Sequence, residues 1–304
     1  MDTLKACEYV VSKAIDVKID HDKYAEFGKI IDDYKGKMDV GAFGRFDIED
    51  GKKRIGAKVL LNSLNFRFWE KKGGALTYFE TEYKGKKERG AGALFASISR
   101  AIDEKVPILE PAYLADIDAD SAEKIFRGAT KMPMLNRRTE IMKELGRKRE
   151  PLDAFLENTE KDYWKMVKTV AFTYPSYRDV WEYGTVIVPF LKRAQLLVSS
   201  LHVQGDVKVK DTESGTIFAD YRVPQALREL GIVKYSQPLA NAVDSLIEIP
   251  AGTFKEVEIR AASVVACDRL TKEYDLKIVE VDNILWMHGR NCKKPHHLTT
   301  TTSY

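Results

Sequence analysis

The sequence has few cysteines, and the three it has lie far apart. Cys7, Cys267 and Cys292 are odd in number, and no two of them form a Cys-x-x-Cys pair in the 304 residues. Disulfide frameworks and cysteine-based zinc sites need paired or closely spaced cysteines. This absence excludes a disulfide-stapled secreted domain and favours a reducing compartment, so we expect an intracellular, cytoplasmic protein.

Long hydrophobic runs and a strong excess of one charge are also missing. No stretch approaches the roughly 20 apolar residues that cross a bilayer, and the first residues lack the apolar segment of a signal peptide. The net charge is +3 with an isoelectric point near 8.5, well short of the basic excess typical of nucleic-acid-binding proteins. We therefore expect neither membrane association nor a stable nucleic-acid partner.

The common sequence signatures of catalysis and cofactor binding are absent as well. The chain has no phosphate-binding P-loop, no dinucleotide fingerprint and no His-Glu-x-x-His zinc pair. It also has no Gly-x-Ser-x-Gly nucleophile elbow. The five histidines are scattered, and only the adjacent pair His296 and His297 suggests metal binding. We therefore expect no cofactor and no metal.

The pattern that is present is mainly helical. Apolar residues recur at helical spacing in most of the chain, with clear stripes over residues 4–15, 94–102, 190–201 and 259–270. No internal repeat and no linker interrupts them. We therefore expect one mainly α-helical domain over residues 1–304.

Two stretches depart from this helical pattern. Residues 57–87 contain aromatic and β-branched residues with glycine turns, which predicts a small antiparallel β-hairpin insertion. Phe66, Phe68 and Trp69 within it form either a buried aromatic corner or the wall of a pocket for a flat ligand. The Thr-rich residues after Pro295 have the composition of a disordered tail.

The most informative stretch surrounds Asp220. Phe218 precedes it, and Pro224 follows at a position suited to open a helix. A carboxylate just before a helix is either an end cap or a reactive group. Asp282 and Trp286 repeat the combination downstream, with Asp282 at an N-cap-like position. Such groups suit cleavage of a glycosidic bond, because a carboxylate stabilises the sugar cation while a ring stacks on the leaving base. The pattern alone leaves both interpretations open.

Six blocks of the sequence, in this order, resemble the queuosine salvage protein family. They lie between about residue 60 and the C-terminus, and the final Tyr304 also matches the family's ending. The blocks are Leu64–Trp69, Pro175–Asp179, Lys192–Gln195, Phe218–Gln225, Glu256–Arg260 and Asp282–Trp286. Members of this family are queuosine 5′-phosphate N-glycosylases, which release the base queuine for reinsertion into tRNA. Each block is short, but six in order make the resemblance specific.

The resemblance implies a fold similar to that of DNA repair glycosylases and hydrolysis of queuosine 5′-monophosphate without a cofactor. It also implies that Asp220 is the catalytic carboxylate, as nucleophile or as transition-state stabiliser. We expect the enzyme to act as a monomer. The substrate-binding residues that we derive from the same blocks are Phe218, Ala219, Asp282, Trp286 and, for the 5′-phosphate, Lys192.

The chemistry of queuine sharpens these expectations. Queuine is a 7-deazaguanine and lacks the N7 that acid protonates in ordinary purine cleavage. The departing base must therefore be helped through another edge, or Asp220 must supply more of the stabilisation. Asp282 could instead pair with the cationic amine of queuine.

The sequence departs from the family pattern at three places. Met287 stands where some relatives carry an acidic residue, Asn62 stands where an aspartate is frequent, and Phe43 or Phe46 lies where a histidine is expected. These departures concern substrate contacts and the preference between nucleotide and nucleoside. The family's similar ending also suggests that the Thr-rich tail folds over the site.

Two other functions stay open on the sequence. The chain could bind queuine or its nucleotide without cleaving it, or it could be a glycosylase that acts on tRNA or another nucleic acid. The second alternative rests on the fold analogy, which is a weak guide to function.

Overall fold

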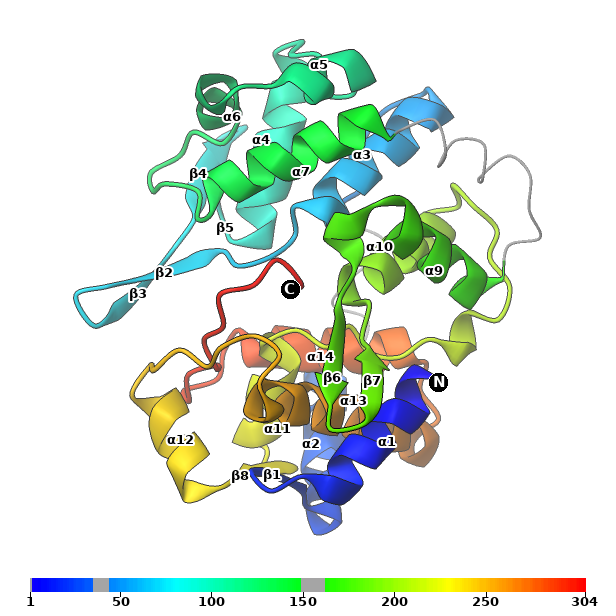
Figure 1. The fold of residues 1–304 in the computed structure, drawn as a ribbon, viewed down its shortest axis with the longest axis vertical. Coiled ribbons are helices and arrows are strands. Elements are labelled where there is room, and N and C mark those ends of the chain that lie inside the picture. The colour runs from blue at the N-terminus through cyan, green and yellow to red at the C-terminus, as the bar shows by residue number, and fades with distance from the viewer. Residues whose placement is uncertain (1, 35–43, 149–161) are drawn as a thin grey trace.

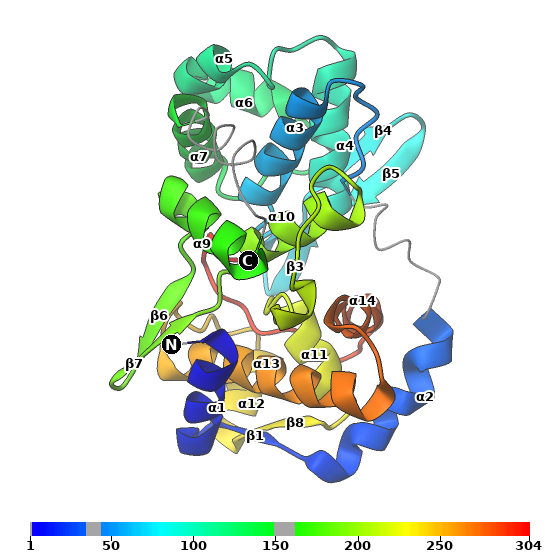
Figure 2. The same cartoon turned by 90° about the vertical axis from the view of Figure 1, so that its right-hand side faces the viewer.

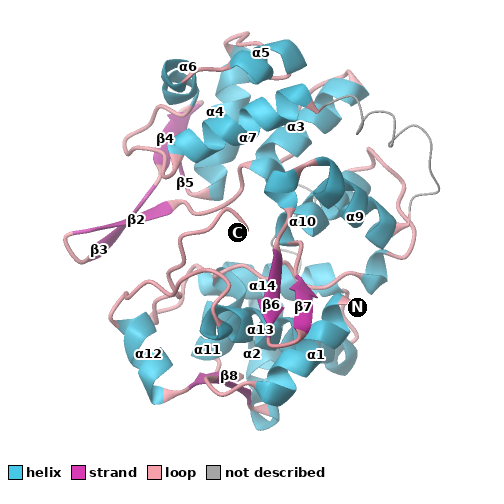
Figure 3. Ribbon diagram, in the orientation of Figure 1, coloured by secondary structure: helices cyan, strands magenta, loops and turns pink. Residues whose placement is uncertain are grey.

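The structure is a computed structural model that describes residues 2–34, 44–148 and 162–304 (Figure 1). These residues are mainly helical with small antiparallel strand pairs, which confirms the predicted class (Figure 3). The helices form two groups, each around its own hydrophobic core. We call them the upper half and the lower half after their places in Figure 1.

The upper half is built around a core that includes Leu60, Leu94, Met142, Val167 and Leu197. Its elements are α3 (Gly51–Ser63), α4 (Ala91–Asp103), α5 (Pro111–Asp116), α6 (Ala119–Ile125), α7 (Leu135–Arg147), α9 (Tyr163–Thr173) and α10 (Lys192–Val203), with the paired strands β4 (Glu80–Tyr83) and β5 (Lys86–Arg89). A second hairpin, β2 (Trp69–Lys72) and β3 (Ala75–Tyr78), projects from its side (Figure 1).

The lower half is organised around one long helix, α13 (Phe254–Tyr274), which is buried throughout Glu256–Cys267. The helices around it are α1 (Thr3–Lys13), α2 (Tyr24–Tyr34), α11 (Arg222–Glu229), α12 (Gln237–Asp244) and α14 (Ile278–Gly289). Two antiparallel strand pairs complete it: β1 (Val17–Ile19) with β8 (Val233–Tyr235), and β6 (Val180–Tyr183) with β7 (Val186–Pro189).

The N-terminal segment is attached to α13 through Glu258. The carboxylate of Glu258 accepts hydrogen bonds from the backbone N–H groups of Ile15, Asp16 and Val17, at 3.2, 2.8 and 3.1 Å. Asp2 caps α1, as its position in the sequence suggests, by accepting from the backbone N–H of Leu4. The segment before residue 20 is therefore part of the lower core.

The predicted β insertion begins later than residue 57 and contains two hairpins. Residues 57–63 belong to α3, so this part of the prediction is wrong. Asp50 caps that helix, and the helix is buried from Gly56 to Ser63. A buried helix and a buried strand both produce a short apolar run such as residues 59–61, and periodicity cannot separate them. The predicted glycine turns at 73–74 and 85 are correct, with φ between 55° and 83°.

The composition of residues 295–304 was a poor guide to their structure. Most of these residues are buried, and the segment passes between the two halves to the centre of the molecule (Figures 1 and 2). The backbone N–H of Ile249 donates to the carbonyl of Leu298 at 2.8 Å, and that of Arg67 donates to the carbonyl of Tyr304 at 3.1 Å. Disorder is therefore the wrong prediction, because composition carries no information about these contacts with distant segments.

No helix in the described ranges is long and apolar enough to span a membrane. Phe46 lies in the upper core next to Phe95, with ring centroids 5.0 Å apart. Phe43, the other residue at the expected histidine position, lies outside the described residues.

Candidate active site

A cleft of about 960 Å³ lies between the two halves. Aromatic and charged side chains from both halves line it, which is the usual make-up of a site for a small polar ligand. Three helices that carry or adjoin lining residues, α10, α11 and α14, lie near the middle of the molecule in Figure 2. The side chains that line the cleft include Asn62, Phe66, Phe68, Tyr78, Lys192, Phe218, Asp220, Arg222, Asp282, Trp286, Met287 and Tyr304.

Asp220 lies just before Tyr221, the N-cap residue of α11, and its carboxylate bonds to the first turn of that helix. Its Oδ1 accepts hydrogen bonds from the backbone N–H groups of Arg222 (2.7 Å) and Val223 (3.0 Å). The side chain also lines the cleft and belongs to a residue that is 7% exposed. Pro224 is the third residue of the helix and not the first. At the third position its missing N–H still costs no intrahelical hydrogen bond. Cap and reactive group are therefore compatible roles for Asp220.

The residues before Asp220 are fixed from three sides. The side chain of Gln195 on α10 makes two hydrogen bonds with Thr216: Oε1 accepts from the Thr216 backbone N–H at 3.0 Å, and Nε2 donates to the Thr216 hydroxyl at 2.9 Å. The backbone N–H of Phe218 donates to Asp282 at 2.8 Å. The carbonyl of Ala219 accepts from Arg260 Nε at 3.0 Å. Phe218 lines the cleft, whereas Ala219 is buried behind it and takes part through its backbone.

Asp282 is the fifth residue of α14 and not an N-cap, which corrects the prediction for its position. The pKa of the Asp282 carboxyl is raised to about 8, mainly by burial and secondly by the negative charge of Asp220. The hydrogen bond from Phe218 and the charge of Lys192 lower this pKa, but by less. The carboxyl is therefore protonated over most of the neutral range. Trp286 lies one turn further along α14 and lines the same cleft.

Lys192 opens α10 on the opposite side of the cleft. It is 6% exposed, and burial lowers the pKa of its ammonium while the charges of Asp220 and Asp282 act in the other direction. The backbone N–H of Lys192 donates to the carboxylate of Asp179 at 3.1 Å. The structure thus brings Lys192 into one cleft with both predicted carboxylates.

The aromatic corner of residues 66–69 has both of the properties considered above. Phe66, Phe68 and Trp69 are all buried, and Phe66 and Phe68 also line the cleft. Behind Phe66 lie two fully buried guanidinium groups, with Arg138 4.1 Å and Arg193 5.2 Å from the ring centroid. The corner is therefore core on one side and cleft wall on the other.

The tail contributes to the site, as the resemblance to the family's ending suggests and its composition does not. Tyr304 lines the cleft, and its hydroxyl donates to Glu256 at 2.8 Å. The ring centroids of His296 and Tyr221 are 4.4 Å apart. Burial lowers the pKa of both His296 and His297 to about 3, so both rings are neutral. In the described part of the chain, no group of His, Cys, Asp and Glu side chains is arranged to hold a metal ion.

The resemblance blocks end in Asp179 and Arg260, but sequence reasoning gave these residues no role; they form a buried ion pair behind the cleft. Arg260 lies between Ile259 and Ala261 on α13, after the buried Glu256 and Glu258 and before the buried run Ala261–Cys267. Charged residues beside such a buried run are unusual core residues. That signal could have identified Arg260 before its contacts were known.

Two of the three departures from the family pattern lie at the cleft. Met287 and Asn62 both line it. The amide of Asn62 donates to the carbonyl of Lys58 at 2.9 Å, so this side chain is held by its own helix.

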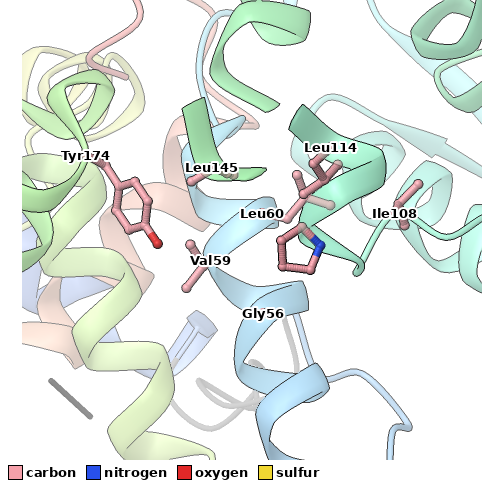
Figure 4. Close-up of a pocket in the computed structure, with 8 residues that line it drawn as sticks. Gly56, Val59, Leu60, Ile108, Leu114, Leu145 and Tyr174 are labelled. Carbon is pink, nitrogen blue, oxygen red and sulfur yellow. The ribbon is translucent and has the colours of Figure 1, made fainter. Parts of the chain in front are cut away.

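A separate cavity of about 10 Å³ lies inside the upper half (Figure 4). Val59, Leu60, Leu114 and Leu145 are among the apolar side chains around it. A space of this size is at the lower limit for a single water molecule. It is a packing gap and not a ligand site.

Comparison with known proteins points to one family. The family model described as "Queuosine salvage protein" matches residues 50–304. A protein of Sphaerobacter thermophilus is 32% identical, with 100% of this chain and 98% of the relative covered. A mouse (Mus musculus) protein is 29% identical over 99% of this chain and 98% of its own length, and a Bos taurus protein is 32% identical over 80% and 79%. All three are named "Queuosine 5′-phosphate N-glycosylase/hydrolase".

Proposed function

Because this chain belongs to the queuosine salvage protein family, we propose that it hydrolyses the N-glycosidic bond of queuosine 5′-monophosphate and releases queuine. The observation that carries the proposal is the meeting of Asp220 and Asp282 in one aromatic cleft. Asp220 comes from the loop before α11 and Asp282 from α14, and Phe218 and Trp286 accompany them.

Asp220 is the residue to which we assign the reaction at the sugar. The backbone N–H groups of Arg222 and Val223 both donate to Oδ1, which orients the carboxylate. We expect the other oxygen, Oδ2, to face the anomeric carbon. Hydrogen bonds from backbone N–H groups stabilise a carboxylate in its charged form. A charged carboxylate can stabilise the sugar cation or attack it, and these are the two roles that the family resemblance implies.

Asp282 is our candidate for the acid that assists the departing base. Its raised pKa supports a protonated carboxyl at neutral pH, and a 7-deazaguanine offers no N7 to receive a proton. In this scheme the bond from C1′ to the base nitrogen breaks, and its electron pair stays on the base. Asp282 donates a proton to the base, and water adds a hydroxyl group to C1′ and loses its other proton to a carboxylate.

The alternative for Asp282 is a salt bridge with the cationic amine of queuine. That role requires the charged carboxylate, whereas the acid role requires the protonated one. The two roles therefore predict opposite effects of rising pH on activity, which makes them separable by experiment.

Lys192 stays our candidate for the 5′-phosphate. Its burial supports a strong charge-assisted contact, because a buried ammonium is poorly solvated before the substrate arrives. Its place next to Asp220 and Asp282 supports a second role as their counter-charge.

A chromatographic assay tests the proposed function. Purified protein is incubated in parallel with queuosine 5′-monophosphate, with queuosine and with tRNA that contains queuosine, and free queuine is quantified. We expect release from the 5′-monophosphate. Tight binding of queuine with no release from any substrate would favour a binding protein, and release from tRNA alone would favour a nucleic-acid glycosylase.

We also propose the finer features expected above: a DNA-glycosylase-like fold from the resemblance, a cytoplasmic location from the cysteine content, no stable nucleic-acid partner from the net charge, and a monomer. Light scattering on a sizing column tests the monomer, and fluorescence microscopy of a tagged chain tests the location. Binding to tRNA, if present, should weaken steeply with salt because phosphate contacts release counterions.

A further inference from the structure

The ion pair of Asp179 and Arg260 lies behind the cleft and has no part in the chemistry proposed above. Arg260 is fully buried in α13, and Asp179, just before β6, is 2% exposed. Nη1 and Nη2 of Arg260 lie 2.8 and 2.5 Å from Oδ1 and Oδ2 of Asp179. Burial raises the pKa of the Asp179 carboxyl, but the charge and hydrogen bonds of Arg260 outweigh it and hold the pKa below its usual range. Both groups are therefore charged, in a bidentate geometry that fixes their orientation.

The third nitrogen of the same guanidinium holds the backbone next to Asp220. Arg260 Nε donates to the carbonyl of Ala219 at 3.0 Å. The guanidinium is planar and rigid, so the Ala219 carbonyl cannot move relative to Asp179 without breaking one of these bonds. On its other side Asp220 is bonded to the first turn of α11. The carboxylate is thus held from both directions along the chain.

Asp179 connects this arrangement to the opposite wall of the cleft. Its Oδ2 accepts from the backbone N–H of Lys192 at 3.1 Å, and its carbonyl accepts from that of Leu191 at 3.1 Å. Leu191 belongs to the upper core, whereas Ala219 belongs to the lower core. The ion pair therefore joins the two halves at the point where Lys192 and Asp220 come together.

The surroundings of the guanidinium place it one side chain away from the cleft. The Cζ of Arg260 lies 4.0 Å from the ring centroid of Phe190 and 4.5 Å from that of Tyr304. Tyr304 lines the cleft, and Arg260 is shielded behind it. A buried ion pair is an uncertain source of stability, because loss of hydration offsets the attraction between the charges. What this pair provides is a fixed geometry.

We propose that Arg260 is a positioning residue for the hydrolysis: held by Asp179, it fixes the Asp220 carboxylate relative to the Lys192 end of α10 without touching the substrate. The inference rests on the proposed function. Displacement of a reacting group by about 1 Å can lower a rate about 100-fold, so loss of this geometry should appear in kcat.

The first test is Arg260→Lys. Lysine keeps a cation for Asp179, but it has no planar fork that also reaches Ala219. We expect kcat for queuosine 5′-monophosphate to fall about 100-fold, while KM and the calorimetric Kd for queuine change by no more than about threefold. A residue that only supported folding would lower Tm without this separation of kcat from binding.

Glu258→Gln is the matched control. Glu258 lies on the same helix, is equally buried and holds the backbone of residues 15–17 on the far side from the cleft. We expect this variant to lower Tm while kcat stays within about twofold of the wild type, because sites without shared partners act independently.

A second variant covers the case in which Arg260→Lys does not fold. Asp179→Asn combined with Arg260→Gln removes both charges of this pair, so that neither residue is left as an unpaired buried ion. Glu256, whose carboxylate lies 3.5 Å from Arg260, keeps its hydrogen bond from the Tyr304 hydroxyl. We expect this double variant to fold and to keep the low kcat.

Four results would overturn the proposal: wild-type kcat in folded Arg260→Lys, wild-type kcat in the folded double variant, failure of both to fold, or a loss of kcat in Glu258→Gln of the same size. If wild-type protein and Glu258→Gln both leave the nucleotide intact, the proposed function itself fails, and this inference falls with it.

Discussion

Asp220 and Asp282 line one cleft, but the chain holds them in different ways. Asp220 is bonded to two backbone N–H groups at a helix start. Asp282 lies inside a helix, receives one backbone hydrogen bond, from Phe218, and has a pKa raised to about 8 by burial and by Asp220. Two carboxyl groups in different surroundings can divide the work of a glycosidase, with one charged and the other carrying a proton. Each prediction below tests this division.

The largest expected effect comes from Asp220→Asn. The amide oxygen can still accept the two hydrogen bonds of the cap, so the protein should fold with nearly unchanged Tm. The negative charge is lost, and we expect kcat to fall about 1,000-fold or more, as for removal of a preorganised electrostatic group. The rate of queuine release measures this. Turnover close to the wild-type value in folded Asp220→Asn would refute the assigned role.

Asp282→Asn should have a smaller effect on kcat and a distinct effect on its pH dependence. Loss of a general acid lowers a rate about 100-fold or more. In the wild type, kcat/KM should fall as pH rises through about 8, because the acid then loses its proton. The variant should lack this decline. A decline that persists in Asp282→Asn would show that another group titrates, and wild-type activity that rises through this range would favour the salt bridge with the amine.

Lys192→Gln tests whether the cation that shares the cleft with the two carboxylates also binds the 5′-phosphate. We expect KM for the 5′-monophosphate to rise about tenfold or more, the worth of one charge-assisted hydrogen bond. KM for queuosine should change little. The positive charge of Lys192 lowers the pKa of Asp282, so the alkaline decline should also move to higher pH. Lys208→Gln, at an exposed lysine of the segment after α10, is the control. An equal rise in KM for nucleotide and nucleoside would exclude a phosphate contact.

The smallest effect is on stability and concerns Asp282 alone. The folded protein keeps the Asp282 proton up to a pH of about 8, whereas the unfolded chain has already lost it. The contribution of Asp282 to the free energy of unfolding should therefore decrease with rising pH over the range 6–8, whereas the neutral His296 and His297 add a contribution of opposite sign that wild type and Asp282→Asn share. The slope of the free energy of unfolding against pH should be more negative in the wild type than in Asp282→Asn, by about 1.4 kcal/mol per pH unit. Urea unfolding at several pH values measures the slopes, and identical slopes would contradict the raised pKa.

The turn around Asp220 could be predicted because its signals are local. A ring, a carboxylate and a proline lie within seven residues, and the helix that follows begins within two residues of the expected position. The helical class was predictable for the same reason, since each helix carries its own apolar period. For Asp282 the local signal was too weak, because a carboxylate within an apolar segment resembles an N-cap when the helix start is misplaced by five residues.

Other parts of the site depend on contacts between distant segments. Arg260 meets Asp179 and Ala219 across 81 and 41 positions of the sequence. Tyr304 meets Glu256 across 48. The strand pair β1–β8 contains only three residues on each side, too few to show a period. Patterns in a single sequence show which residues are neighbours along one helix or strand. The partners in these contacts lie in different segments, so no such pattern connects them.

The attachment of residues 15–17 to Glu258 has a consequence for anyone who shortens this protein. The matched family region starts at residue 50, and a chain trimmed to that boundary would lose α1, β1 and α2. The Glu258 carboxylate would lose three donors, β8 would become an unpaired edge, and the apolar side of α13 under α1 would face water. Exposed strand edges and apolar surfaces promote aggregation. Poor recovery of such a fragment would therefore report a missing wall of the core and say nothing about catalysis.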